Sequence, residues 1–248
     1  MRSFYILFAQ ECKKLFWQPG SYFIAAFFLI LMGFNYVYIL FDACKAPCEN
    51  CSLESLFETF WFPTLFILPL LTMRIFSEEY RLGLLESLLT TPISTRSLVI
   101  SKFLTTYLFY NLLWLLCLAF PYFTQAWLGD TLATTFVENS VLTGGCLFIA
   151  LTSFLFVSIG VFTSSLTHSQ TLAGLLCFGI LFILFIGFRV LCECLGPQHE
   201  IITYVQFQQT LSDFCTGILD FRPCIFYICS GIIFLGLTTL VLDHKSIR

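Results

Sequence analysis

Charged side chains are scarce in this chain: Asp, Glu, Lys and Arg together make up only 11% of its residues. A soluble domain has about 25%. Hydrophobic residues reach 58%, so there is too little polar material to cover a surface that faces water on all sides. This balance excludes a soluble globular protein and indicates a membrane protein.

The sequence also lacks the motifs of several functional classes. No Gly-Lys pair occurs, so the phosphate loop of nucleotide-hydrolysing enzymes is absent. The three histidines, His168, His199 and His244, lie far apart, and none accompanies a Ser or Cys in a catalytic arrangement. No predicted span has an ionisable residue near its centre, which argues against ion-coupled carriers and voltage sensors. We predict no catalytic residue, no metal site, no cofactor bound by this chain and no nucleic-acid partner.

Long apolar runs are abundant instead. A helix needs about 20 mostly apolar residues to cross roughly 30 Å of hydrocarbon. The chain is predicted to be an all-α integral membrane protein, one domain over residues 1–248. The six predicted transmembrane helices cover about 21–41, 57–76, 103–128, 139–163, 170–191 and 224–242. Pro63 and Pro69 predict a kink in the second span. No small-residue cleavage site follows the first run, so we expect that run to remain in the membrane.

Basic residues set the expected orientation, because loops rich in Lys and Arg face the cytoplasm. With both termini cytoplasmic, nine basic residues lie inside: Arg2, Lys13, Lys14, Arg74, Arg81, Arg96, Lys102, Lys245 and Arg248. Three lie outside: Lys45, Arg189 and Arg222. We therefore predict a multi-pass protein of a bacterial cytoplasmic membrane with both termini in the cytoplasm.

Residues 1–18 precede the first span. Apolar side chains recur there at helical spacing, at Phe4, Leu7, Phe8, Cys12, Leu15 and Phe16, and Lys13 and Lys14 lie off that stripe. The pattern predicts an amphipathic helix in the cytoplasmic interface. The alternative, a plain extension of the first span, would place two lysines in hydrocarbon.

A short charged segment, about 77–91, separates the second and third spans. Ser77 is a candidate helix cap, and Glu78 and Glu79 supply the acidic first turn that a helix favours. Thr91-Pro92 ends the helix. A loop that only set topology would need basic residues, not a capped helix with three acids. We infer that a partner on the cytoplasmic side binds this helix.

A long semi-apolar loop, about 193–222, precedes the last span. Its apolar residues are interrupted by Gln206, Gln208, Gln209 and Asp213. The loop is too polar to span a membrane and too apolar for a free linker. Short helices that dip into the outer interface fit this composition, and loops of such length usually have a function.

Residues 76–104, FSEEYRLGLLESLLTTPISTRSLVISKFL, resemble the ABC-2 type permeases, the membrane subunits of one class of ABC transporters. The residues that fill the family pattern are Glu78, Glu79, Arg81, Gly83, Glu86, Leu88, Leu89, Pro92, Ser94 and Lys102. Leu84 departs from it, where Thr is common, and so does Ser101, where Gly is common. A second run, before the last span, is similar to a motif shared by the gliding-motility and nitrous-oxide-accessory branches of the family. Its residues are Phe214, Gly217, Ile218, Leu219 and Asp220.

The resemblance implies a permease subunit of an ABC exporter of unknown substrate. Two such permeases, identical or similar, would pair in the bilayer above two separate ATPase subunits that bind ATP and Mg²⁺. The helix at 77–91 would be the coupling helix, and the loop before the last span an external helical hairpin. The expected coupling residues are Glu78, Glu79, Arg81, Gly83, Glu86, Leu88, Leu89 and Pro92. The expected hairpin residues are Phe214, Gly217 and Asp220.

Two other functions remain open from the sequence. The first is a non-transporting membrane scaffold or assembly factor with the same architecture, which would have no ATPase partner. The second is a membrane-embedded enzyme, which the absence of an intramembrane catalytic group disfavours.

Ten of the twelve cysteines fall into two groups. Cys117, Cys146, Cys177 and Cys229 lie within predicted spans and fit small apolar fillers. Six others lie in the two predicted external loops: Cys44, Cys48, Cys51, Cys192, Cys194 and Cys215. Disulfides are expected there because the compartment outside a bacterial cytoplasmic membrane is oxidising. A soft-metal site at the first three cysteines is the weaker alternative.

Peptide mapping tests the disulfide hypothesis. We expect at least one pair among the six loop cysteines to resist alkylation until a reductant is added, and the span cysteines to form no bridged peptide. Free alkylation of all six without reductant would refute the hypothesis.

Overall fold

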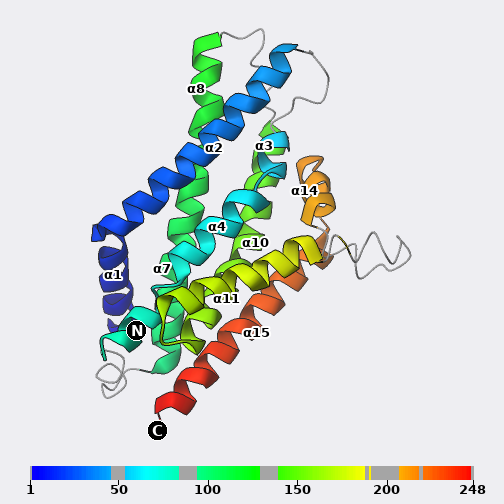
Figure 1. Cartoon of the computed structure of the whole chain (residues 1–248). Helices are drawn as coiled ribbons and strands as arrows, with labels where there is room; N and C mark the ends of the chain where they lie inside the picture. The colour runs from blue at the N-terminus through cyan, green and yellow to red at the C-terminus, as the bar shows by residue number, and fades with distance from the viewer. Residues whose placement is uncertain are drawn as a thin grey trace.

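The computed structural model describes residues 2–45, 54–83, 94–128, 139–187, 190, 207–217 and 220–246 (Figure 1). Every regular element in these ranges is helical, in agreement with the predicted fold class. The α-helices are α1 (Arg2–Trp17), α2 (Pro19–Lys45), α3 (Glu54–Glu58), α4 (Trp61–Thr72), α5 (Ser77–Arg81), α7 (Thr95–Cys117), α8 (Ala119–Leu128), α10 (Asn139–Leu166), α11 (Gln170–Phe182), α14 (Phe207–Cys215) and α15 (Phe221–Ser246). A π-helix, η1 (Ile183–Gly187), continues α11.

Five stretches of the described chain are long and apolar enough to cross a membrane. They are Pro19–Phe41, Thr95–Thr124, Val141–Leu166, Gln170–Gly187 and Phe221–Lys245. Each overlaps one of the six predicted spans. The third predicted span begins earlier than expected, at Thr95, and α7 gives way to α8 at Leu118.

The second predicted span, 57–76, is not one helix. Proline has no backbone N–H, so Pro63 cannot donate to the Thr59 carbonyl, and the chain turns at Thr59–Phe60 between α3 and α4. Pro69 removes a second bond inside α4. The 12 residues of α4 extend about 18 Å, well short of the hydrocarbon thickness. The segment folds as consecutive short helices: the chain turns just before Pro63, whereas α4 continues through Pro69.

Residues 2–17 form a helix, as predicted, but α1 packs along α7 and does not lie only on a lipid surface. Glu11 pairs with Lys102, the Cys12 thiol lies 3.6 Å from the Thr105 hydroxyl, and the ring of Phe16 contacts that of Phe109. In these three pairs the residue numbers rise together in α1 and α7, so α1 runs parallel to the first half of α7. The apolar stripe therefore contacts a transmembrane helix, and the interfacial placement of α1 stays a prediction.

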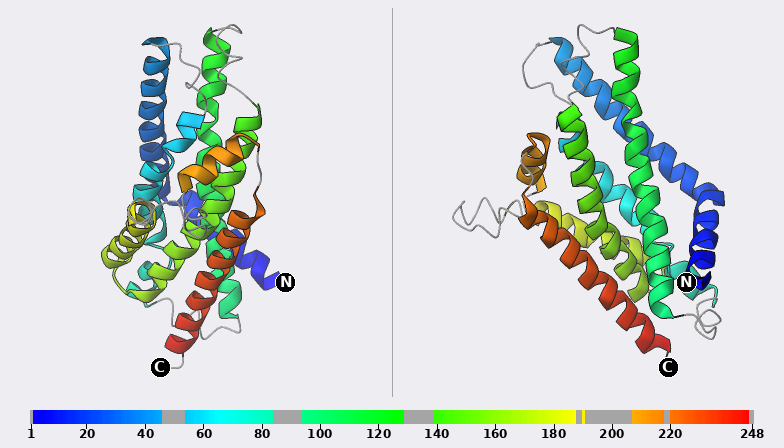
Figure 2. Two further views of the ribbon diagram at one scale, coloured as in Figure 1. Left: turned by 90° about the vertical axis from the view of Figure 1, so that its right-hand side faces the viewer. Right: turned by 180° about the vertical axis from the view of Figure 1, so that it is seen from behind.

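Helix α10 is the central helix of the bundle. Two-thirds of the residues in its apolar stretch are buried, 67%, against 17% to 44% in the other four spans. It packs against α4, α7, α11, α14 and α15. Figure 2 shows α10 enclosed by these helices in both views. Close approach requires small residues here: a side chain at Gly160 would meet Thr72 at 2.5 Å, and one at Gly145 would meet the Phe57 ring at 2.5 Å.

The two ends of α10 hold two different short helices. Near its start, Gly144 lies against the backbone of α14, and near its end, Ser164 bonds to the start of α5. Twenty residues of helix separate these points, about 30 Å, which is the thickness of the hydrocarbon core. If α10 crosses the membrane, α5 and α14 lie on opposite sides of it. The start of α1 and the end of α15 lie at the α5 end (Figures 1 and 2).

Helix α14 is the described part of the predicted external helical loop. Its apolar face is buried: the Phe207 ring stacks on Tyr227 at 5.8 Å, and the Phe214 ring lies 5.9 Å from Phe148. The helix ends at Cys215, and Gly217 then takes φ +85°, a conformation that favours glycine. Asp220 immediately precedes α15. The predicted motif residues thus end one helix and begin the next.

Substitution of Gly144 tests the contact between α10 and α14. A Cβ at Gly144 would overlap the Phe214 carbonyl oxygen, a backbone atom that cannot rotate away. Gly144→Ala should lower the free energy of unfolding by about 1–3 kcal/mol, measured by chemical unfolding in detergent micelles. Gly236→Ala is the matched control, because nothing lies within 4 Å of a Cβ there. It should be neutral or stabilise by up to about 1 kcal/mol. Equal effects of the two variants would contradict the packing.

Candidate functional site

The start of α5 is held by another helix. The backbone N–H groups of Phe76 and Ser77 both donate to the Ser164 hydroxyl oxygen of α10, at 3.0 and 3.3 Å. The predicted cap, Ser77, is instead inside the helix, and its hydroxyl donates to the Met73 carbonyl. The cap prediction was wrong because α10 supplies an acceptor from 87 residues away in sequence.

The described part of the predicted coupling helix is shorter than 77–91. Helix α5 ends at Arg81, and Gly83 adopts φ +68°, a left-handed conformation that terminates helices. A continuous helix from Ser77 is therefore ruled out at Gly83. Four predicted coupling residues, Glu86, Leu88, Leu89 and Pro92, lie outside the described residues.

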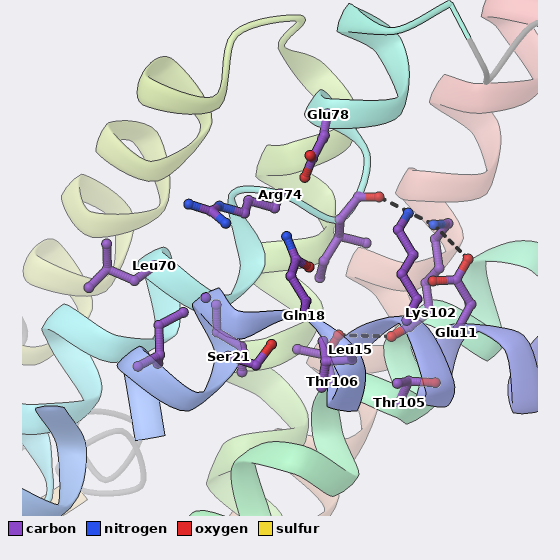
Figure 3. Close-up of a pocket in the computed structure, with 15 residues that line it drawn as sticks. Glu11, Leu15, Gln18, Ser21, Leu70, Arg74, Glu78, Lys102, Thr105 and Thr106 are labelled. Carbon is purple, nitrogen blue, oxygen red and sulfur yellow. Dashed lines mark hydrogen bonds and ion pairs between the residues drawn. The ribbon is translucent and has the colours of Figure 1, made fainter. Parts of the chain in front are cut away.

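A buried ammonium group joins α5 to α7 and α1. The Lys102 Nζ of α7 donates to Glu79 Oε1 at 2.6 Å, to Glu11 Oε1 at 3.0 Å and to the Ile75 carbonyl at 3.3 Å. These three acceptors use all three protons of the ammonium. The side chains of Lys102 and Glu79 are only 2% and 5% exposed. Figure 3 shows Lys102 and Glu11 meeting between their two helices.

Lys14 of α1 completes what we term the charge cluster: Glu11, Lys14, Glu79 and Lys102. The Lys14 Nζ donates to Glu79 Oε1 at 3.1 Å. Partial burial lowers the pKa of Lys14, but the carboxylate of Glu79, aided by Glu11 and Glu78, outweighs it, so the pKa is raised. Two cations and two anions balance. The second carboxylate oxygen of Glu79 is buried without a partner among the described residues.

Tyr80 anchors the other side of α5. Its ring contacts the His168 ring at 4.9 Å, and the Lys245 ammonium of α15 lies 4.3 Å from the ring centroid. Lys245 also donates to the Ser165 carbonyl at the end of α10 at 2.9 Å. Burial raises the pKa of the Tyr80 phenol to about 12, so the ring stays neutral. Helix α5 is thus fixed to α1, α7, α10 and α15.

The structure separates the predicted coupling residues by exposure. Glu79 is buried in the charge cluster, and Glu78 is half-buried. Arg81, Leu82 and Gly83 are exposed. A partner in solution can therefore reach the C-terminal end of α5, whereas the carboxylate of Glu79 is occupied within the chain.

Sequence reasoning missed Glu11 and Lys14 as partners of this site. A signal was present: Leu7, Glu11 and Leu15 follow one another at spacing four, so Glu11 lies on the packed face of α1. No comparable signal marks Ser164 or Lys245, which reach α5 only through the tertiary fold.

Other predicted site residues lie elsewhere. The buried Cys215 lies in α14, and Cys44 is the next-to-last residue of α2. The other four loop cysteines lie outside the described residues. In the described part of the chain, no three His, Cys, Asp or Glu side chains are placed to hold a metal ion.

A double-mutant cycle tests the buried pair. Lys102→Met or Glu79→Gln alone should lower the free energy of unfolding by about 3–5 kcal/mol, because each leaves the other buried charge without its nearest partner. The double variant should cost less than the sum of the two. Lys13→Met, at an exposed position of α1, is the matched control and should change stability by less than about 0.5 kcal/mol. Strict additivity would show that the two groups are not coupled.

Comparison with known proteins agrees with this architecture. Residues 19–241 match the family described as ABC-2 family transporter protein, and this range contains every described helix except α1 and the last residues of α15. A search of curated proteins gave no significant match. Members of this family are membrane components of transport systems that work with an ABC ATPase. The match extends over most of the chain, so the protein belongs to the ABC-2 family of transporter proteins, as a multi-pass permease component.

Proposed function

We propose that this chain is the permease subunit of an ABC exporter in a bacterial cytoplasmic membrane, driven by a separate ATPase subunit. ATP and Mg²⁺ bind to that subunit and not to this chain. The proposal is supported by the family match and by the five apolar helices. The observation that carries it is the anchoring of α5 between four longer helices, with its last residues exposed.

Coupling to an ATPase requires a firm connection between α5 and the transmembrane helices, and the contacts of α5 provide it. A force on the exposed Arg81 and Leu82 is transmitted to α7 through the Glu79–Lys102 pair, at 2.6 Å. It reaches α10 through the two hydrogen bonds to Ser164. Closure of the ATPase subunits would therefore shift two transmembrane helices together, not bend a flexible loop.

The proposed orientation places α5 and both termini in the cytoplasm. Basic residues at this end favour that side. Helix α14, at the opposite end of α10, then faces outward, as in the gliding-motility and nitrous-oxide-accessory branches that its motif resembles. A second permease, identical or similar, would complete the transporter. The exposed apolar surface of α2 supports such contacts with a partner or with lipid.

Affinity purification from native membranes tests the proposal. We expect an ATPase with a phosphate loop to co-purify with the full-length chain after mild cross-linking. Arg81→Glu combined with Leu82→Asp should abolish that association and leave the unfolding midpoint unchanged, because both side chains are exposed.

The matched control is Gln209→Glu, an exposed position on α14 at the other end of the bundle. It should retain the ATPase. If no ATPase is captured with the wild-type chain, or if the α5 variant binds it normally, the coupling assignment is wrong. The first of these results would favour a scaffold or assembly factor.

A further inference from the structure

A small cavity lies beside the charge cluster, at the start of α2. It is bounded by α1, α2, α5, α7 and the end of α4 (Figure 3). Its polar lining includes Gln18, Ser21, Arg74 and Glu78. Its volume is about 50 Å³. Pockets for small molecules usually measure about 300–1,000 Å³. The cavity suits one polar group of a larger molecule whose remainder lies outside.

Two charged residues of this cavity are not used by the charge cluster. Glu11, Lys14 and Lys102 line it but pair with one another or with Glu79. Among the described residues, neither Arg74 nor Glu78 forms an ion pair. Beyond the charge cluster, the lining thus offers one cation and one anion, which together carry no net charge.

Arg74 lies beside the first turn of α2, where the apolar stretch that can cross a membrane begins. A Cβ added at Gly20 would lie 2.9 Å from Arg74 Nη1, so the guanidinium rests on the first turn of α2. The apolar stretch that can cross the membrane starts at Pro19, one residue earlier. Lipid headgroups occupy this depth.

An apolar stripe leads away from the cavity along α4. Leu70 both lines the cavity and is 38% exposed. Phe66 and Phe62 follow at spacing four, 41% and 42% exposed, with their rings 5.3 Å apart. Eight other residues of this 12-residue helix are buried. The stripe is therefore a narrow apolar track that begins at a polar cavity.

We infer that this site binds one zwitterionic phospholipid with a primary ammonium headgroup. The phosphate contacts Arg74, with Gln18 as a further donor, and the ammonium contacts Glu78. An acyl chain lies on Leu70, Phe66 and Phe62. Arginine is suited to a phosphate because its planar fork donates two parallel hydrogen bonds. A purely anionic headgroup would meet the Glu78 carboxylate, and a free phosphate would leave the apolar stripe without a ligand.

Lipid retention by the full-length chain tests this site without any ATPase, so the result is independent of the proposed function. The purified protein is equilibrated in micelles with equal amounts of phosphatidylethanolamine, phosphatidylcholine and phosphatidylglycerol of one acyl composition. Retained lipids are counted by native mass spectrometry. We expect retention of phosphatidylethanolamine about tenfold above phosphatidylcholine, the worth of one charge-assisted hydrogen bond.

Variants of Arg74 and Glu78 test which residue contacts the phosphate and which contacts the ammonium of the headgroup. Arg74→Gln should lower retention of phosphatidylethanolamine and phosphatidylglycerol about tenfold, and Arg74→Lys should restore part of it. Glu78→Gln should remove the preference for phosphatidylethanolamine over phosphatidylglycerol. The matched control is Arg96→Gln, an exposed arginine on α7 that does not line the cavity, and it should change nothing.

Three results would overturn the inference. They are retention by the wild-type protein of lipids in the proportions of the mixture, an effect of Arg96→Gln equal to that of Arg74→Gln, and a Phe66→Ser variant that keeps its lipid retention while a dimer dissociates. The last of these would identify the α4 stripe as an interface between two copies of the chain. Gel filtration in the same micelles confirms that each variant remains folded.

Discussion

The arrangement of this end of the molecule depends on a buried ion pair, Lys102 with Glu79, at 2.6 Å. Separated from water, either charge alone would be costly, and the pair is tolerated because further partners satisfy it. Glu11 and the Ile75 carbonyl complete the lysine's bonds, and Lys14 shares the Glu79 oxygen. Once Lys102 is buried on α7, α1 and α5 must both lie where their carboxylates can reach it. One side chain thus fixes the relative positions of three helices.

The central helix α10 connects the two short helices that do not span the membrane. At one end, the Ser164 hydroxyl accepts a hydrogen bond from the start of α5. At the other end, the absence of a side chain at Gly144 lets the backbone of α14 lie close to α10. These contacts differ in kind: hydrogen bonds hold α5, whereas aromatic packing around Phe207 and Phe214 holds α14. A displacement of α10 therefore changes both sides of the bundle. This connection is a direct physical link between the two ends of the bundle.

Neighbouring residues in and just after α5 have different surroundings. Glu79 faces inward and anchors the helix, Glu78 faces the cavity, and Arg81 and Leu82 are exposed. The sequence analysis found Glu78, Glu79 and Arg81 but not Leu82, and it treated the acids as one recognition surface. A helix of five residues presents neighbours on different faces, so adjacent glutamates cannot share an environment. Which face is buried was decided by Lys102 and Lys14, from elements distant in sequence.

The sequence by itself determined the membrane class, the helical fold, the approximate limits of five spans and the place of the charged segment between them. Each of these follows from local composition, because about 20 apolar residues suffice to cross a bilayer wherever they occur. Only the tertiary structure decided that α1 lies along α7, that Ser164 caps α5 and that Glu79 is buried. Pro63 and Pro69 were evident in the sequence and predicted a kink, but the chain turns before Pro63 and α4 ends at Thr72, so the segment is not one continuous span. Contacts between residues 23 or more positions apart carry no local periodicity, so the burial and the partners of these residues were decided by the packed bundle.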